Sequence, residues 1–471
     1  MVVASDAAAA AILQRTLTRQ VTRKKAMREE LSDGASGSSC IRVFVRVRPL
    51  GEGRGERGSL VQVDPVLNCI TVASARGASG AAPAQDTQRF DFERVCDERE
   101  DNASLLQTIG KPLVESVCAG YNGTLFAYGQ TGSGKTYTIG EMARLDTPHE
   151  GVAHRMVREL YSELAHMHCK QFKVSVQFVQ VYMENVHDLL GEADADGPPP
   201  VGAAAPAKLQ LREDKAHGVY VQGAREVACA SATACLETLA QAGKNLKVAA
   251  TKMNRQSSRS HAVCRLFVEV HHSESEAAPG GAAAGGGAGA GAGARGDGAA
   301  GGAKKPIDGF DADIESWRKR SVASIETQVE RRVHAAATTT ATLTLCDLAG
   351  SEDVGRSGAT GAALAEAKKI NTSLLALGNV IDALTQKRPG KRSAPAHVPF
   401  RDSVLTRLLQ QSLGGNCKTA LVVCASPADA VVTETLSTLR FASRAKFVRN
   451  AARVNAVIDA SSLHALSLIH I

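Results

Sequence analysis

Residues 129–136, GQTGSGKT, have side-chain types and a spacing that suit phosphate binding. They follow the pattern G-x-x-x-x-G-K-S/T, in which glycines let backbone N–H groups converge on phosphate oxygens. The positive end of the helix that follows points at the same oxygens. Lys135 is expected on the β- and γ-phosphates, and the Thr136 hydroxyl is expected to ligate Mg²⁺.

The apolar run GTLFAY (123–128) comes directly before this loop and predicts a strand. A strand, a loop and a helix in that order favour a phosphate cradle over a plain glycine-rich turn. The candidate cradle residues are Gly129, Gln130, Thr131, Gly132, Ser133, Gly134, Lys135 and Thr136.

Two further motifs could sense the γ-phosphate. In DLAG (347–350), Asp347 ends a predicted strand and can hold the Mg²⁺ shell. The Gly350 N–H can bond the γ-phosphate only while it is present, which is the basis of a switch. In NRQSSRSH (254–261), the adjacent hydroxyls of Ser257 and Ser258 with Arg259 suit Mg²⁺ and phosphate. Each motif is weak alone, and a polar turn is the alternative for the second.

Alternating strands and helices are expected to position these motifs. IRVFVRV (41–47) alternates apolar and other residues with a period of two, which predicts a strand. Apolar residues recur at helical spacing between Leu364 and Leu384 and predict a long amphipathic helix. Further strand candidates, rich in β-branched residues, are 172–182, 264–270, 342–348 and 419–426. The pattern predicts one α/β domain with a central, mostly parallel sheet flanked by helices.

Composition narrows the class of protein. The chain has 471 residues, of which 44% are hydrophobic and only 4% aromatic, so Ala, Val and Leu must fill its core. The net charge of +7 suits an acidic partner without requiring one. Eleven cysteines without a C-x-x-C pair favour free thiols over a disulfide framework or a zinc site. We expect no membrane span and no nucleic-acid partner.

Several segments lie outside this pattern. Residues 1–40 are expected to form a basic, disordered extension, with a transit peptide as the alternative. Low-complexity insertions are expected at 75–87, 191–207 and 272–337, because sequence so rich in Gly and Ala cannot offset its ordering entropy. Residues 460–471 have no assigned structure, and their apolar ending predicts a truncated or non-native terminus.

From about Ile41 to Asn455 the sequence resembles the kinesin motor domain. The matching stretches, in the family's order, are IRVFVRVRP for the first strand, FAYGQTGSGKTYT for the phosphate loop, NRQSSRSH for switch I, DLAGSE for switch II, EAKKINTSLLALGNVIDAL for the relay helix and HVPFRDSVLTRLLQQSLGGN for the segment after it. The resemblance implies a kinesin motor fold over residues 41–447, a P-loop NTPase domain that binds ATP with Mg²⁺ and hydrolyses it.

The resemblance also assigns roles. Arg46 and Pro49 are expected to flank the adenine, with Tyr137 on its other side. The implied Mg²⁺ ligands are Thr136, Ser258 and, through water, Asp347. Ser257 is implied to position the attacking water, while Arg259 and Glu352 form a salt bridge that closes the switches over the γ-phosphate. Glu352 then helps to relay a proton.

The implied partner is the microtubule, in the cytoplasm and on the cytoskeleton. Cations expected on the track-binding face are Arg356, Lys387, Arg388, Lys391, Arg392, Arg401 and Arg407. Asp353, Thr372 and Val404 stand where the family often has a cation, so we expect weaker or more salt-sensitive binding. Leu246 replaces the family's usual Arg near the nucleotide.

Residues 448–459 resemble the neck linker of plus-end-directed kinesins. Asn450, Val454 and Asn455 are expected to dock on the core, with residues before Ile41 as a cover strand. A helical neck at residues 15–31 is the minus-end alternative. Dimerisation would need a stalk that this chain does not contain. A non-motile microtubule-binding protein with a weak or uncoupled ATPase is the alternative function, and an unrelated P-loop ATPase fits the paired switches less well.

Overall fold

The computed structural model describes residues 39–51, 56, 60–73, 87–145, 150–167, 169–191, 209–214, 218–252, 259–272, 337–352, 361–385 and 397–458. These residues fall into two compact units. The larger unit holds the described residues within 39–167, 172–270 and 340–455. The smaller unit holds 169–171, 271–272, 337–339 and 456–458.

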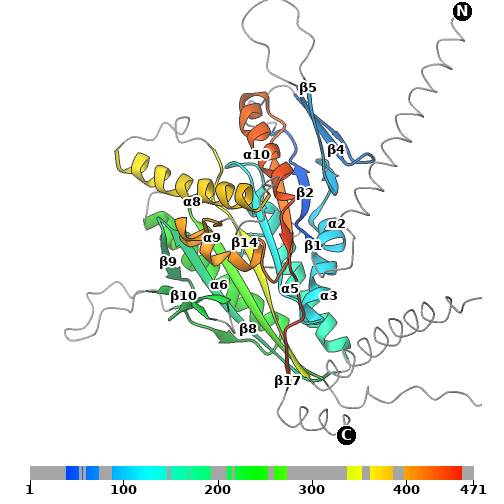
Figure 1. Ribbon diagram of the computed structural model, residues 1–471, viewed down its shortest axis with the longest axis vertical. Coiled ribbons are helices and arrows are strands. Elements are labelled where there is room, and N and C mark those ends of the chain that lie inside the picture. The colour runs from blue at the N-terminus through cyan, green and yellow to red at the C-terminus, as the bar shows by residue number, and fades with distance from the viewer. Residues whose placement is uncertain are drawn as a thin grey trace, which may run out of the picture. The chain divides into compact units, whose positions relative to one another are not determined.

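A ten-stranded sheet organises the fold, in the order β12-β8-β13-β14-β7-β15-β2-β6, with β17 beside β14 and β9 beside β8 (Figure 1). Its strands are β2 (Arg42–Val47), β6 (Arg94–Cys96), β7 (Gly123–Tyr128), β8 (Cys169–Tyr182), β9 (Asn185–Asp188), β12 (Val227–Ala228), β13 (His261–His272), β14 (Ala337–Asp347), β15 (Lys418–Ala425) and β17 (Ala456–Ile458).

The centre of this sheet is parallel: β14 pairs with β7, β7 with β15, β15 with β2 and β2 with β6. Every residue of β7 is buried, as expected for a strand covered on both faces. In the register, Asp347 at the end of β14 lies beside Ala127. The carboxyl ends of β7 and β14 therefore share one edge of the sheet, where the phosphate loop begins.

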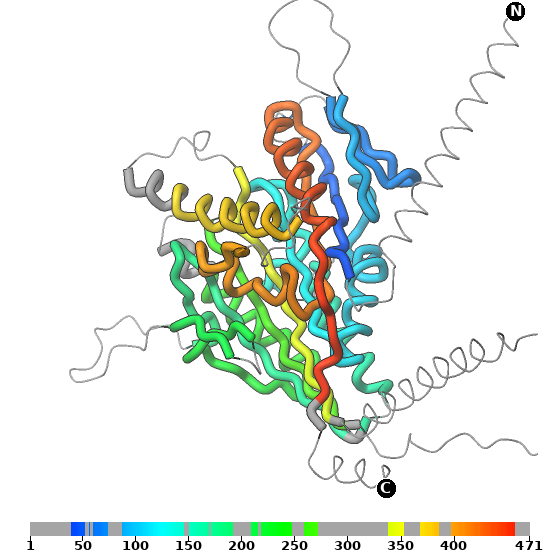
Figure 2. Tube along the Cα trace, in the orientation of Figure 1, coloured from blue at the N-terminus to red at the C-terminus, as the bar shows by residue number. Residues whose placement is uncertain are grey.

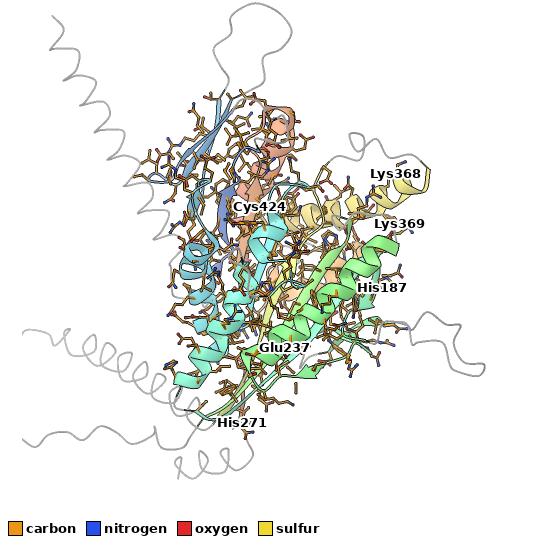
Figure 3. All side chains as sticks on the ribbon, turned by 180° about the vertical axis from the view of Figure 1, so that it is seen from behind. His187, Glu237, His271, Lys368, Lys369 and Cys424 are labelled. Carbon is orange, nitrogen blue, oxygen red and sulfur yellow. The ribbon has the colours of Figure 1, made fainter. Side chains whose placement is uncertain are left out.

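Helices cover both faces of the sheet. They are α2 (Asn102–Leu105), the π-helix η2 (Leu106–Gly110), α3 (Lys111–Cys118), α4 (Lys135–Ile139), α5 (Val152–His166), α6 (Ala232–Lys252), α8 (Gly361–Thr385), α9 (Val404–Leu408) and α10 (Val432–Ala445), with 3-10 turns η6 (Phe400–Asp402), η7 (Gln410–Ser412) and η8 (Asp429–Val431). Figures 1 and 3 show α8 and α10 on one face and α5 and α6 on the other.

The core on the α8 and α10 side is built from the apolar stripe of α8 and from aromatic stacking. Leu377, Val380 and Ile381 of α8 are fully buried. On α10, the Phe441 ring stacks on Tyr128 at the end of β7, with ring centroids 3.9 Å apart. Helix α10 is thus packed against the end of the strand that leads into the phosphate loop.

Smaller sheets complete the structure. β3 (Val61–Asp64), β4 (Cys69–Ala73) and β5 (Thr87–Asp91) form an antiparallel sheet, and β10 (Gln210–Asp214) pairs with β11 (Gly218–Gln222). β1 (Ser39–Cys40) pairs antiparallel with β16 (Arg449–Asn450), which brings the first described residues beside the segment that follows α10 (Figure 2).

The fold class expected from the sequence is confirmed. Each predicted strand falls within an observed one: 41–47 in β2, 172–182 in β8, 264–270 in β13, 342–348 in β14 and 419–426 in β15, to within a residue or so. The amphipathic pattern is α8. All eleven cysteines are free. The expected insertions lie almost wholly outside the described residues. Within the described part of the chain, no helix is long and apolar enough to cross a membrane.

Candidate nucleotide site and switch segments

The phosphate loop depends on glycine for its shape. Gly129 and Gly134 have φ of +149° and +103°, a region that side-chain-bearing residues rarely adopt. A Cβ on Gly129 would also lie 2.3 Å from the carbonyl oxygen of Cys424 in β15. The loop is held by the carbonyl of Gln130, which accepts hydrogen bonds from Ser133 Oγ at 2.7 Å and Lys135 Nζ at 2.9 Å. Helix α4 starts at Lys135.

The two expected Mg²⁺ ligands Thr136 and Asp347 lie together beside this loop. The Thr136 hydroxyl donates to Asp347 Oδ2 at 2.6 Å. Asp347 Oδ1 is buried and has no hydrogen-bond partner among the described atoms. Burial raises the pKa of Asp347 and lowers that of Lys135, and the opposite charge of each partly offsets this. An unsatisfied carboxylate oxygen next to an exposed hydroxyl fits the oxygen ligands that Mg²⁺ prefers.

Switch II closes directly onto the loop. The Ser351 N–H donates to the Gly129 carbonyl at 3.1 Å. The Glu352 carboxylate accepts the Thr131 N–H at 2.8 Å and the Thr131 hydroxyl. Gly350 leaves room for this contact, because a Cβ there would lie 2.1 Å from the Glu352 carboxylate and 2.2 Å from the Thr131 hydroxyl and would push these side-chain ends apart. The expected switch glycine therefore has a packing reason as well.

Switch I is described only from Arg259 onward, and Ser257 and Ser258 lie outside the described residues. Arg259 lines a small pocket with Glu184, His261 and Lys369 among its neighbours. The hydrogen bonds described for the Glu352 carboxylate go to Thr131. The salt bridge between Arg259 and Glu352 therefore stays a prediction for another state of the switches.

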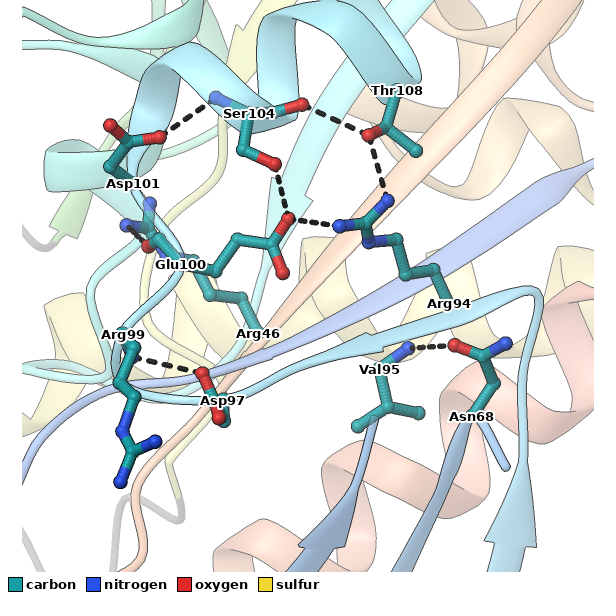
Figure 4. Close-up of polar contacts among 10 residues, drawn as sticks. All are labelled: Arg46, Asn68, Arg94, Val95, Asp97, Arg99, Glu100, Asp101, Ser104 and Thr108. Atoms are coloured by element: carbon teal, nitrogen blue, oxygen red, sulfur yellow. Dashed lines mark hydrogen bonds and ion pairs between the residues drawn. The ribbon is translucent and has the colours of Figure 1, made fainter. Parts of the chain in front are cut away.

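A polar network surrounds Arg46 on the side where the base is expected, and Figure 4 shows its part around Glu100. The Arg46 guanidinium donates to Asn102 Oδ1 at 2.5 Å, Thr138 Oγ1 at 3.0 Å and the Glu100 carbonyl at 2.8 Å. It lies 5.0 Å from the centre of the Tyr137 ring, which is 49% exposed. Exposed Pro49 stands nearby in sequence. Arg46 thus supports Tyr137 and α4 from within, and its direct contact with adenine stays a prediction.

Sequence reasoning missed two contributors to this region. Arg48 Nε donates to the Gly132 carbonyl of the phosphate loop at 2.8 Å, and its guanidinium pairs with Glu56 at 2.5 Å. Asn102 Nδ2 donates to the carbonyls of Tyr137 at 3.1 Å and Glu150 at 2.9 Å. Arg48 lies inside the quoted IRVFVRVRP stretch, where only Arg46 and Pro49 were given a role, and Asn102 belongs to no quoted motif.

The expected track-binding cations are only partly described. Arg401 is exposed in η6, and Arg407 is half-buried in α9. The others, Arg356, Lys387, Arg388, Lys391 and Arg392, lie outside the described residues. Lys368 and Lys369 on α8 are exposed and were not singled out from the sequence (Figure 3). Their position in the EAKKIN run of the relay helix was the available signal.

The linker segment is held by the side chain of Asn450 and by backbone hydrogen bonds. Asn450 Nδ2 donates to the carbonyls of Ser412 at 3.0 Å and Cys417 at 2.8 Å, and its Oδ1 accepts the Gly414 N–H at 2.7 Å. The Asn455 N–H donates to the Gly120 carbonyl at 2.9 Å. Ile41 N–H donates to the Val448 carbonyl at 3.0 Å. These contacts lie on the segment that the sequence marks as a linker.

A parallel sheet with a glycine loop and an acidic switch at its carboxyl edge defines a P-loop nucleotide-binding protein. The sequence pattern of the kinesin motor domain matches residues 46–284 and 300–448 of the chain. The chain therefore belongs to the kinesin motor domain family.

Similar proteins agree with this assignment. A kinesin heavy chain of Syncephalastrum racemosum is 37% identical over 378 residues, covering 80% of this chain and 32% of the relative. Kinesin-like protein 3 of Schizosaccharomyces pombe is 34% identical, covering 90% of this chain and 61% of the relative. The chain thus spans between about a third and three-fifths of these relatives.

Two solved structures are similar throughout. A fast kinesin is 33% identical with a TM-score of 0.64, covering 90% of this chain and 95% of its own. A KIF14 dimer, in a two-heads-bound state with AMP-PNP in complex with a microtubule, is 29% identical with a TM-score of 0.67, covering 91% of this chain and 100% of its own.

Proposed function

We propose that this chain is the head of an ATP-driven microtubule motor, which hydrolyses ATP with Mg²⁺ and acts on microtubules in the cytoplasm. The carrying observation is that Asp347 and Glu352, the two acids of one switch, contact the phosphate loop at Thr136 and Thr131. A switch in that position can report whether a γ-phosphate is present. The similar KIF14 structure holds AMP-PNP in complex with a microtubule, which supports the same substrate and track here.

The cradle residues bind and orient the triphosphate. Lys135 and the loop N–H groups hold the β- and γ-phosphates. Thr136, Asp347 and Ser258 would hold Mg²⁺, which would neutralise charge developing on the transferred phosphoryl group. Ser257 positions the attacking water. Tyr137 and Pro49 face the base, with Arg46 beneath the Tyr137 ring.

The switch residues respond to the γ-phosphate. Its negative charge repels the Glu352 carboxylate from Thr131, where the carboxylate lies in this structure. Glu352 then pairs with Arg259, which closes the switches and excludes bulk water. From that position Glu352 accepts the proton of the attacking water through a second water.

The output passes through α8 and the linker. Asn371 Nδ2 of α8 donates to the Glu352 carbonyl at 3.1 Å, so a movement of switch II pulls on the relay helix. At the other end, β16 pairs with β1 and Asn450 is bound within the core, as a docked linker after the last motor helix would be. This arrangement supports plus-end-directed movement.

Steady-state ATP hydrolysis by the full chain, with and without microtubules at low salt, tests the proposal. A motor head should show turnover that rises at least about tenfold at saturating microtubules, and polarity-marked gliding should then move toward the plus end. No turnover, or turnover indifferent to microtubules, would contradict it.

A non-motile microtubule-binding protein is the second candidate. Thr372 is exposed on α8 and Val404 opens α9, and both lack the charge expected there. Exposed Leu375 lies one turn from Thr372. Binding to microtubules without stimulation of turnover would favour this reading over the motor.

A further inference from the structure

We propose that His261 is a positioning residue that links switch II to the relay helix α8 through hydrogen bonds to Ala349 and Ser373, and that microtubule stimulation of turnover depends on this link. The inference rests on the proposed motor function. His261 is the last residue of the NRQSSRSH stretch, and neither the sequence motif nor the nucleotide site gave it a role.

The contacts come from three separate parts of the chain. His261 begins β13 and is only 2% exposed. Its Nδ1 accepts the N–H of Ala349 in switch II at 3.0 Å. Its Nε2 lies 2.9 Å from the Ser373 hydroxyl of α8. The neighbouring Ser260 accepts a hydrogen bond from Gln180 Nε2 of β8 at 2.8 Å, which anchors the start of β13 to the adjacent strand.

The chemistry of the groups fixes the direction of each hydrogen bond. A backbone N–H can only donate, so Nδ1 must be unprotonated and a neutral ring carries its proton on Nε2. Nε2 therefore donates to Ser373 Oγ, whose own proton goes to the Ile370 carbonyl at 2.6 Å. Burial and nearby Lys135 keep the ring neutral, lowering the pKa of His261 to about 3. The hydrogen bonds therefore run in one direction, from the Ala349 N–H through the His261 ring and the Ser373 hydroxyl to the Ile370 carbonyl.

This link gives switch II a second attachment to α8. The first is Asn371, whose side chain donates to the Glu352 carbonyl. The second holds Ala349, the residue before Gly350, through His261. With both ends of the stretch from Ala349 to Glu352 tied to one helix, a shift of α8 has to move the whole segment. On its opposite side, α8 exposes Lys368, Thr372 and Leu375, and this is the side that a bound microtubule would contact.

The test uses Ser373→Ala in the full chain, because this change removes the hydroxyl and leaves the buried volume nearly intact. Basal turnover should stay within about twofold of wild type, and the stimulation by saturating microtubules should fall at least about fivefold. Thr385→Ala is the matched control, since it removes a similar hydroxyl bonded to the Ile381 carbonyl at 2.9 Å on the same helix, and it should leave the stimulation unchanged.

Two substitutions of His261 separate the two hydrogen bonds. In His261→Asn, the amide oxygen can keep the bond to Ala349, while the side chain no longer reaches Ser373. In His261→Gln, the amide nitrogen can keep the bond to Ser373 and lose the one to Ala349. Each should lower microtubule stimulation, and hydrogen exchange at the Ala349 amide should quicken only in His261→Gln. Combining His261→Asn with Ser373→Ala should be no worse than either alone, because both break the same link.

The outcomes are distinct. If wild type shows no stimulation, the proposed function fails first. If wild type is stimulated and Ser373→Ala is stimulated equally, the link is not used and the inference fails. A parallel fall of basal and stimulated rates, or additive effects in the double variant, would show a merely structural role and would also overturn it.

Discussion

The Glu352 carboxylate occupies the mouth of the phosphate loop, where it accepts two hydrogen bonds from Thr131. A γ-phosphate bound to the same N–H group would have to displace it. We therefore expect the position of Glu352 to affect how tightly the triphosphate binds.

Removing the Thr131 hydroxyl should weaken the hold on Glu352 and favour the triphosphate. We expect Thr131→Val to bind AMP-PNP about threefold more tightly, since one charge-assisted hydrogen bond is lost from the competing state. ADP affinity serves as the internal control, because ADP has no γ-phosphate, and it should change little. Titration with fluorescent nucleotides measures both. Weaker AMP-PNP binding would mean that the hydroxyl serves the nucleotide instead.

His261 should also make stability depend on pH. The folded ring has a pKa lowered from 6.5 to about 3 by burial and by Lys135. Between these values the unfolded chain binds a proton that the folded chain does not, so the free energy of unfolding falls as the pH drops below 6.5. The contribution is about 1.4 kcal/mol per pH unit at most.

Chemical unfolding of wild type and His261→Asn between pH 4.5 and 7.5 checks this. Wild type should lose stability more steeply toward acid pH than the variant, while exposed His397→Asn should follow wild type. Parallel curves for wild type and His261→Asn would contradict the expected slope.

At the scale of elements, the β8–β9 turn fixes the short helix α9. Met183 and Glu184 have φ of 48° and 61°, in the left-handed region that non-glycine residues seldom adopt. From this turn the Glu184 carboxylate accepts the Val404 N–H at 2.6 Å and the Ser403 hydroxyl at 3.0 Å. The turn thus caps the helix that carries Arg407, next to Arg401 in η6.

Losing these hydrogen bonds should loosen the proposed track-binding face and leave the phosphate loop unchanged. We expect Glu184→Ala to raise the Kd for microtubules about fivefold, with basal turnover unchanged, because a hydrogen bond to a charged group typically contributes about 1.5–3 kcal/mol. The matched control is Glu237→Ala, at an exposed position of α6 on the other face of the sheet. It removes the same charge and should not change the Kd. Co-sedimentation with microtubules gives both values.

Local patterns in the sequence were enough for the strands, α8 and the phosphate loop. The period of two that predicts a strand depends only on residues close together in the sequence. The same holds for the apolar stripe of α8 and for the glycine spacing of the phosphate loop. The Glu184 cap joins residues 219 positions apart, and the His261 link to Ser373 spans 112. Such contacts leave no periodic trace in one sequence. Arg46 shows the same limit, since RVRP identified the residue but not that its guanidinium faces inward.

For the whole molecule, we expect charge on the proposed track-binding side to decide how microtubule affinity responds to salt. Exposed Thr372 replaces an expected cation next to Lys368 and Lys369. We expect microtubule affinity to fall steeply with added salt, because exposed charges are largely screened beyond about 10 Å at 0.1 M.

Thr372→Lys should restore part of the lost attraction. At low salt we expect it to tighten microtubule binding about threefold and to lose that gain at high salt, as for exposed charge pairs in general. The control Thr233→Lys adds the same charge at an exposed position of α6, and it should have no effect on the Kd. A response to salt that is flat in wild type, or equal gains from both variants, would argue against charge on the α8 side.

The buried network around Arg46 bears on which nucleoside the site accepts. The guanidinium donates to Asn102, Thr138 and Glu100. In the proposed site, the groups left to contact the base are the half-exposed Tyr137 ring and Pro49. An aromatic face stacks on any base, whereas discrimination needs hydrogen bonds to the base edge. GTP should therefore compete with ATP at a Ki within about tenfold of the ATP Kd. A much higher Ki for GTP would show that the protein makes hydrogen bonds to the edge of the base.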